Sequence, residues 1–230
     1  MAKIVLITGA SQGANSRDGF ELARLIAEKG RIVYVGSRND ESGKTAVGIL
    51  HSEGLSTVKP VMIDITKPST IESAKNAIEA AEGRLDVLVN NVGIALMDKE
   101  QLGLYPDMTA VREIMATNFF GTIETTVAFL PLLRKSCAAG NTPIIVNVSS
   151  GLGSNTLSQE YGRAKYVGYR ASKVALNSYT ISLALELQEG GFKVNAPIRD
   201  GGLAMLPWAL LDAKGPTGKF FGPGGDEYPW

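Results

Sequence analysis

The chain has 230 residues, of which 44% are apolar and 20% charged, and its 23 basic side chains balance 23 acidic ones. A net charge of zero, without a block of Lys or Arg, gives no electrostatic footprint for nucleic acid or an anionic membrane. The single histidine and single cysteine exclude a multi-histidine metal site and an internal disulfide. We therefore expect small-molecule chemistry in one domain over residues 1–230.

The apolar stretches are too short to span a bilayer, and the first strand-like run begins at residue 4 without a cleavage-like segment before it. These features predict a cytoplasmic protein without a membrane partner. Composition leaves the oligomeric state open between monomer and homo-oligomer.

Apolar runs of strand length alternate with amphipathic runs of helix length along the chain. The strand-like runs are 4–7, 32–35, 58–63, 85–89, 144–148, 192–195 and 219–221. The helix-like runs are 19–29, 43–53, 69–82, 109–135 and 169–189. This alternation predicts an α/β fold, a single-domain Rossmann-type doubly wound parallel sheet of about seven strands flanked by helices.

Ligands of such sheets bind beyond the carboxyl ends of the strands, so the residues that follow each strand are candidates. The first strand is followed by Thr8-Gly9-Ala10-Ser11-Gln12-Gly13. In this glycine-bearing turn, backbone N–H groups and the next helix N-terminus can receive a pyrophosphate. The candidates here are Gly9, Ser11, Gln12 and Gly13.

Three further strand ends carry polar residues that fit the rest of a dinucleotide. The second ends in Ser37-Arg38-Asn39, and Arg38 stands where an NAD site would place an acidic residue, which favours the 2′-phosphate of NADP. The third is followed by Asp64-Ile65, placed to edge the adenine. The fourth ends in Asn90-Asn91-Val92-Gly93, where Asn91 and Gly93 could lie against a ribose.

The stretch Tyr169-Arg170-Ala171-Ser172-Lys173 sets a phenol and an ammonium four residues apart on one helix face. A nearby cation lowers the pKa of a tyrosine, so Lys173 can turn Tyr169 into a working acid or base. Tyr161 and Lys165 have the same spacing, but Gly162 and Gly168 interrupt their segment. We therefore interpret Tyr169 as the chemical residue and Tyr161 as part of a loop.

Together these motifs resemble the classical short-chain dehydrogenases/reductases, and within that family the carbonyl-reductase-like branch. The likeness extends from Thr8-Gly9 to the ending 215–221. It implies that Tyr169 gives a proton to a carbonyl oxygen that Ser150 holds, and that Lys173 lowers the pKa of Tyr169 and binds the nicotinamide ribose. By the same resemblance, Asn118 anchors a water that links Lys173 to solvent.

The chain departs from the family pattern at two places. Residue 15 is Asn where a third glycine is usual, so we interpret 15–18 as an insertion and Gly19 as that glycine, 19 residues before Arg38. After Ala196 the chain lacks the family's Pro-Gly step, and 197–202 lead almost directly into the next helix-like run. This resemblance implies that the segment covering the substrate is missing or much shortened.

The sequence thus predicts an NADPH-dependent oxidoreductase that reduces a ketone or aldehyde, with NAD as the less favoured cofactor. Pocket walls are expected from 94–108, 151–168 and 197–208, and an apolar carbonyl compound is the expected partner. The alternative is a non-catalytic or impaired NADP(H)-binding homologue, because of the insertion and the shortened lid. An interaction module without a ligand would require all four strand ends to be coincidental.

Overall fold

The computed structural model describes residues 2–11 and 17–230. Within these residues one sheet has seven parallel strands in the order β3-β2-β1-β4-β5-β6-β7. The strands are β1 (Ile4–Ile7), β2 (Ile32–Ser37), β3 (Val58–Met62), β4 (Val87–Asn90), β5 (Ile144–Asn147), β6 (Lys193–Pro197) and β7 (Lys219–Phe221). The predicted Rossmann-type fold is confirmed, and the strand order reverses between β1 and β4, where such sheets bind ligands.

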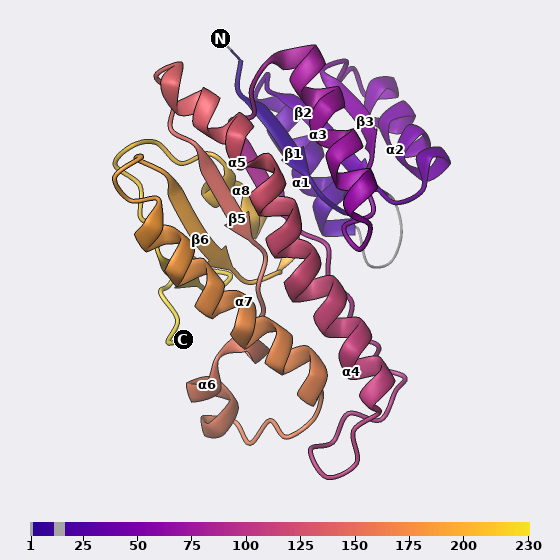
Figure 1. The fold of residues 1–230 in the computed structure, drawn as a ribbon, viewed down its shortest axis with the longest axis vertical. Helices are drawn as coiled ribbons and strands as arrows, with labels where there is room; N and C mark the ends of the chain where they lie inside the picture. Colours follow the sequence, from indigo (N-terminus) through magenta and orange to yellow (C-terminus); the bar gives the residue numbers. More distant parts are fainter. Residues whose placement is uncertain (1, 12–16) are drawn as a thin grey trace.

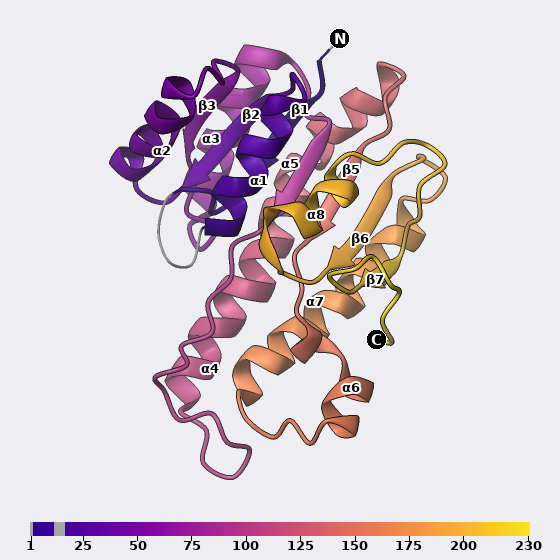
Figure 2. The same cartoon turned by 180° about the vertical axis from the view of Figure 1, so that it is seen from behind.

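Helices cover both faces of the sheet (Figures 1 and 2). One face packs against α1 (Arg17–Glu28), α2 (Asp40–Ser52) and α8 (Gly201–Ala209). The other face packs against α3 (Pro68–Glu82), α5 (Thr122–Ala138) and α7 (Val167–Glu186). Because side chains alternate along a strand, Val5 and Ile7 join the first core, while Ile4 and Leu6 join the second. Among the described helices, none is long and apolar enough to cross a lipid bilayer.

The short helices α4 (Met108–Met115) and α6 (Asn155–Glu160) extend beyond the carboxyl edge of the sheet (Figure 1). The predicted helix 109–135 is interrupted, since a π-helical turn (Ala116–Gly121) separates α4 from α5. A Cβ on Gly121 would lie 2.6 Å from the carbonyl oxygen of Ile65. The glycine therefore lets this turn press against the end of β3, and the turn carries Asn118 towards the switch point.

Three helices begin two or three residues earlier than their apolar patterns predicted. Helix α2 begins at Asp40 instead of 43, because Asn39 caps it by accepting a hydrogen bond of 2.8 Å from the backbone N of Ser42. Gly43 stays inside the helix because it packs closely on Ser37. Helices α1 and α7 each begin two residues before their predicted starts, at Arg17 and Val167.

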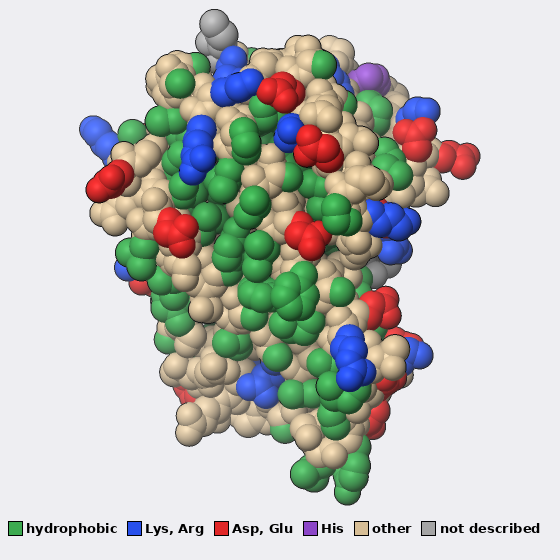
Figure 3. Space-filling model, in the orientation of Figure 1, with side chains coloured by type: hydrophobic (Ala, Val, Ile, Leu, Met, Phe, Trp, Pro, Cys, Tyr) green, Lys and Arg blue, Asp and Glu red, His purple; other side chains and the backbone are tan. Residues whose placement is uncertain are grey.

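Apolar side chains remain exposed on the face covered by α3, α5 and α7. Figure 3 shows them gathered over α5 and α7. Phe120, Val127 and Leu185 are 54%, 56% and 67% exposed.

The amino end of the sheet is fixed by the buried carboxylate of Asp86. It accepts hydrogen bonds from the backbone N of Ile4 at 2.7 Å, from Nε of Arg84 at 3.1 Å and from Oγ of Ser136. These donors come from β1, from the residues just before β4, and from α5. One side chain therefore joins the centre of the sheet to a covering helix, at the edge opposite the switch point.

We expect Asp86→Ala to lower the free energy of unfolding by roughly 3 kcal/mol, because it removes the acceptor of two buried donors and one of the partners of the Arg84 guanidinium. Urea denaturation followed by circular dichroism measures this loss. The matched control is Asp98→Ala, at an exposed aspartate that forms an ion pair with Lys99, which should change stability by less than about 0.5 kcal/mol. Equal midpoints for the two variants would contradict the role assigned to Asp86.

Candidate active site

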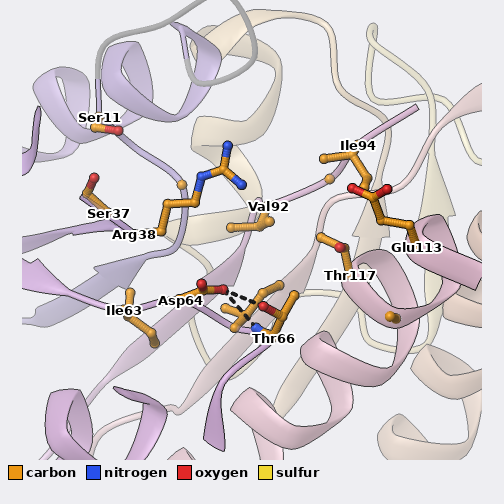
Figure 4. A pocket seen from close by; sticks show the side chains of 14 residues that line it. Ser11, Ser37, Arg38, Ile63, Asp64, Thr66, Val92, Ile94, Glu113 and Thr117 are labelled. Carbon is orange, nitrogen blue, oxygen red and sulfur yellow. Dashed lines mark hydrogen bonds between the residues drawn. The ribbon is translucent and has the colours of Figure 1, made fainter. Parts of the chain in front are cut away.

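A cavity of about 420 Å³ lies beyond the carboxyl ends of β1 to β4 (Figure 4). Half of its lining consists of residues predicted to bind a cofactor: Gly9, Ser11, Ser37, Arg38, Asp64, Ile65 and Gly93. Val92 belongs to the strand end 90–93 and Ile94 to the wall 94–108, both of which were also predicted. The residues that the sequence did not indicate are Ile63, Thr66, Glu113, Ala116 and Thr117. Glu113 and Thr117 come from α4 and the π turn, and no local motif signals their approach.

The glycine turn after β1 is shaped by close backbone contacts. Gly9 has φ +63°, and a Cβ there would lie 2.8 Å from Cγ2 of Val92. A Cβ on Gly19 would lie 2.5 Å from Nδ2 of Asn91 and 3.0 Å from the carbonyl oxygen of Gly9. Gly19 thus lets α1 pack directly on the turn, as the third glycine of a dinucleotide-binding turn does. The predicted Gln12 and Gly13, and residues 15 and 16 of the insertion, lie outside the described residues.

The backbone at Asn91 was predicted to lie against a ribose, and this stays a prediction; its side chain is buried in the frame of the turn, and Asn91 does not line the cavity. Its Nδ2 donates to the carbonyl oxygens of Thr8 at 3.0 Å and Gly9 at 2.9 Å. The physical reason is that these two carbonyls of the turn need donors inside the protein. Asn91 therefore shapes the site by holding the backbone of the turn in place.

The three residues predicted at the end of β2 do not all face the cavity in the same way. Arg38 is exposed at the cavity, and its guanidinium extends over it from β2 (Figure 4). Ser37 is buried and donates to the backbone oxygen of Asn39 at 2.8 Å. Asn39 caps α2 and does not line this cavity, and its contact with a cofactor stays a prediction.

Asp64 faces the cavity as a carboxylate held by its own turn. Its Oδ1 accepts from N of Thr66 at 3.1 Å and from Oγ1 of Thr66 at 2.7 Å, and Lys67 lies 3.4 Å from Oδ2. Burial opposes the charge, yet the hydrogen bonds from Thr66 and the ammonium of Lys67 hold the pKa of Asp64 below its ordinary value. The cavity thus keeps a negative charge near the end of β3.

Lys173 and Asn118 converge on Gly93 at the inner end of the cavity. A Cβ on Gly93 would lie 3.4 Å from Nζ of Lys173 and 3.6 Å from Oδ1 of Asn118. Asn118 is fully buried: its Oδ1 accepts from N of Ile94 at 2.8 Å, and its Nδ2 donates to Oγ of Ser172 at 3.0 Å. Nζ of Lys173 donates to the carbonyl oxygen of Val148 at 2.7 Å.

Tyr169 lies beside Lys173, whose Nζ is 5.7 Å from the centre of the phenol ring. The sequence predicted that Lys173 lowers the pKa of Tyr169, but in the structure this pKa is raised. Burial raises this pKa, and the groups that oppose the rise are Ser150, through a hydrogen bond, and the charge of Arg199. The physical reason is that Lys173 itself is buried, and burial together with Arg199 lowers the pKa of its ammonium to about 7.

Ser150 is positioned by the residues around it. Oγ of Ser149 donates to Oδ1 of Asn177 at 2.6 Å, and Nδ2 of Asn177 donates to the carbonyl oxygen of Gly153 at 3.1 Å. A Cβ on Gly153 would lie 3.0 Å from Cβ of Lys173, so the segment presses on α7. Asn177 therefore fixes both sides of Ser150 to the helix that carries Tyr169 and Lys173.

The wall at 94–108 is fastened to α7 by Gln101, which sequence reasoning missed. Its side chain is buried, its Nε2 donates to the carbonyl oxygens of Ala95 and Leu96, and its Oε1 accepts from N of Tyr169 at 3.3 Å. Tyr161, the other tyrosine at the same spacing, is 61% exposed at the end of α6 and stacks with Arg163. Only one of the two tyrosines therefore adjoins Lys173.

The connection between β6 and α8 is three residues long, 198–200. It carries a second residue that sequence reasoning missed, Arg199. Nη2 of Arg199 donates to the backbone oxygen and to Oδ1 of Asn91, and Nε lies 3.9 Å from Oδ2 of Asp18. The short connection thus places a cation beside the glycine turn, in the region where the substrate-covering segment was expected to begin.

Residues 3–199 match the family model of the short chain dehydrogenases. The chain belongs to this family of oxidoreductases. A short-chain dehydrogenase/reductase of Aspergillus fumigatus is 35% identical over 191 residues, 81% of this chain and 70% of that protein. Another, from Stachybotrys chlorohalonatus, is 35% identical over 250 residues, 95% of this chain and 87% of that one.

Solved structures agree with the fold. NADPH-bound carbonyl reductase from chicken fatty liver superposes with a TM-score of 0.83 at 22% identity, covering 100% of this chain and 99% of that chain. The 3-ketoacyl-(acyl-carrier-protein) reductase of Brucella melitensis, complexed with NADH, gives 0.73 at 28% identity, covering 85% and 74%. Both are complexes with nicotinamide cofactors, the group that this family binds.

The described residues fit such a cofactor. Gly9 and Gly19 leave the backbone of the turn and the start of α1 without side chains at their closest approach. The cavity continues from this turn past Arg38 and Asp64 to Gly93, beside Lys173. It therefore offers a continuous surface from a phosphate site to the catalytic candidates.

The lowered pKa of Lys173 predicts a pH-dependent stability. Its pKa is 10.5 in the unfolded chain and about 7 in the fold, so between these values the unfolded chain binds one more proton. Raising the pH from 7 to 9 should therefore stabilise the fold by on the order of 1 kcal/mol per pH unit, a gain lost as the pH falls back to 7. Urea unfolding at pH 7, 8 and 9 measures it, and Lys173→Met should remove this slope. Equal slopes would show that Lys173 keeps its ordinary pKa.

Proposed function

We propose that this protein is an NADPH-dependent reductase of the carbonyl-reductase type, which converts a ketone or aldehyde to an alcohol. The observation that carries the proposal is the grouping of Tyr169 with Ser150 and Lys173, and of Lys173 with Asn118 beside Gly93, which lines the cavity. Reduction of a carbonyl needs a proton donor and a polar group that holds the developing alkoxide. The bound nicotinamide supplies the hydride.

In this proposal Ser150 donates a hydrogen bond to the carbonyl oxygen, and the Tyr169 hydroxyl transfers its proton to the same oxygen as the carbon is reduced. Burial raises the pKa of Tyr169, so the phenol is protonated at neutral pH and has a proton to transfer. Lys173, with a pKa of about 7, can return a proton to Tyr169 or hold a ribose hydroxyl. Asn118 fixes Ile94 and the adjacent wall of the site.

Arg38 supports NADP as the cofactor. No ion pair or hydrogen bond within the described residues engages its guanidinium, which extends over the cavity at the end of β2. A guanidinium forms paired hydrogen bonds with a phosphate, and an acidic residue at this place would repel it. The 2′-phosphate of NADP therefore suits this end of the site better than the hydroxyl of NAD.

The proposed partner is a small apolar carbonyl compound or its alcohol, with walls from 94–108, 151–168 and 197–208. A balanced net charge supports the absence of a nucleic-acid or membrane partner, and we propose the cytoplasm as the compartment. The short β6–α8 connection favours a second candidate: a homologue that binds NADP(H) without turnover.

We expect Tyr169→Phe to lower turnover by roughly 10²- to 10⁴-fold, the usual contribution of a general acid, while NADPH affinity stays unchanged. Oxidation of NADPH with a panel of aryl ketones, quinones and aldehydes measures turnover, and calorimetry measures affinity. Tyr161→Phe is the matched control and should keep full activity. NADPH binding by the natural chain without turnover of any substrate would favour the second candidate.

Replacing Arg38 by Gln should weaken NADP⁺ binding roughly 10- to 100-fold and leave NAD⁺ binding unchanged, because one charge-assisted contact to the 2′-phosphate is lost. Calorimetric titration with both dinucleotides measures the difference. Arg134→Gln, at an exposed arginine of α5, should change neither affinity. A parallel loss for both dinucleotides would argue against 2′-phosphate recognition by Arg38.

A further inference from the structure

Arg199 is carried by a backbone that is fixed on both sides. Before it, N of Ile198 donates to the carbonyl oxygen of Phe221 at 2.9 Å, and Ile198 bridges to Ser149. After it, α8 packs on α1 so closely that a Cβ on Gly202 would lie 2.7 Å from the backbone N of Leu22. The three-residue connection therefore holds Arg199 in one region, beside the start of α1.

The guanidinium lies against the frame of the glycine turn. It bonds to Asn91, which in turn bonds to the carbonyl oxygen of Gly9. Its second neighbour, Asp18, directly precedes Gly19 in the first turn of α1. The Arg199 side chain is 26% exposed, so part of it is open to a ligand in solution.

The ion pair with Asp18 is loose. The 3.9 Å between Nε and Oδ2 is beyond hydrogen-bonding distance, and a partly exposed pair of this kind contributes little. A guanidinium has five donors in a planar fork that matches phosphate geometry, and the start of a helix favours negative charge. A diphosphate beside this turn would be a stronger partner for Arg199 than Asp18.

We propose that Arg199 binds the pyrophosphate of the dinucleotide, so that this chain holds NADP with two arginines, Arg38 on the 2′-phosphate and Arg199 on the diphosphate. The inference rests on the proposed cofactor. Charge complementarity supports it, because each of the two phosphate-bearing parts of NADP then has one guanidinium. The charge of Arg199 also reaches Tyr169 and Lys173, as expected for a group between the glycine turn and the catalytic residues.

Calorimetry with two probes tests the assignment. NADP⁺ carries both the 2′-phosphate and the diphosphate, whereas adenosine 2′-monophosphate carries only the first. Arg199→Gln should weaken NADP⁺ binding on the order of 10- to 100-fold and leave adenosine 2′-monophosphate unchanged. Arg38→Gln should weaken both probes. Asp18→Asn, which removes the competing carboxylate, should tighten NADP⁺ binding a few-fold.

Unchanged or tighter NADP⁺ binding by Arg199→Gln would overturn the inference and leave the proposed function standing. So would an Arg199→Gln variant in which only the KM for the carbonyl substrate rises, since Arg199 would then recognise the substrate. Equal weakening of both probes would mean general damage to the site and also overturn it. If the natural chain binds neither probe, the inference fails together with the proposed cofactor. NADP⁺ binding by the natural chain without turnover would contradict only the proposed reductase activity.

Discussion

The hydrogen bonds of Asn91 hold together the parts of the molecule that meet at the switch point. Its backbone N donates a hydrogen bond to Oγ1 of Thr8 at 3.0 Å, and its Nδ2 donates to the carbonyl oxygens of Thr8 and Gly9. Its backbone oxygen and its Oδ1 accept hydrogen bonds from Nη2 of Arg199, which lies on the β6–α8 connection. Because Asn91 is buried, its bonds to Thr8 and Gly9 set the relative positions of β1 and β4, and its bonds to Arg199 add the β6–α8 connection.

A second buried polar network joins the same edge of the sheet to the helices that carry the catalytic candidates. Nδ2 of Asn90 donates to Oγ1 of Thr126 on α5 and to Oδ1 of Asn147 on β5, each at 2.9 Å. Nδ2 of Asn147 then donates to Oγ1 of Thr180 on α7, also at 2.9 Å. Apolar packing alone would let these helices slide along the sheet, whereas paired polar groups allow one position. Because α7 carries Tyr169 and Lys173, the network also fixes the positions of these two residues.

The sheet was predictable because its strands are buried on both faces, which makes them continuous apolar runs separated by amphipathic helices. The strand-end residues were predictable for the same reason, since topology brings carboxyl ends to one edge. The sequence alone does not show whether a polar side chain contacts a ligand or supports the backbone around the site. Asn39 and Asn91 stand at the expected positions, but backbone groups nearby use their hydrogen bonds. Gln101 and Arg199 act across long sequence separations that no local pattern records.

The pKa values of the site residues could not be predicted from the sequence either. A spacing of four residues shows that Tyr169 and Lys173 share a helix face, but the pKa of each depends on burial, which only the packed structure determines. The π turn before α5 is similar: nothing in 116–121 departs from a helical pattern, and the contact between Gly121 and the end of β3 is a tertiary one.

The three-residue connection after β6 has a kinetic consequence. A long covering segment must open before product leaves, which ties each turnover to a backbone motion on the microsecond-to-millisecond scale. The chain between β6 and α8 is only three residues long, too short to fold over a bound molecule. For the proposed reductase, small molecules would therefore exchange at this edge without waiting for that motion, while water admitted there would weaken the electrostatic interactions within the site. The proposal thus couples rapid exchange to a slower chemical step.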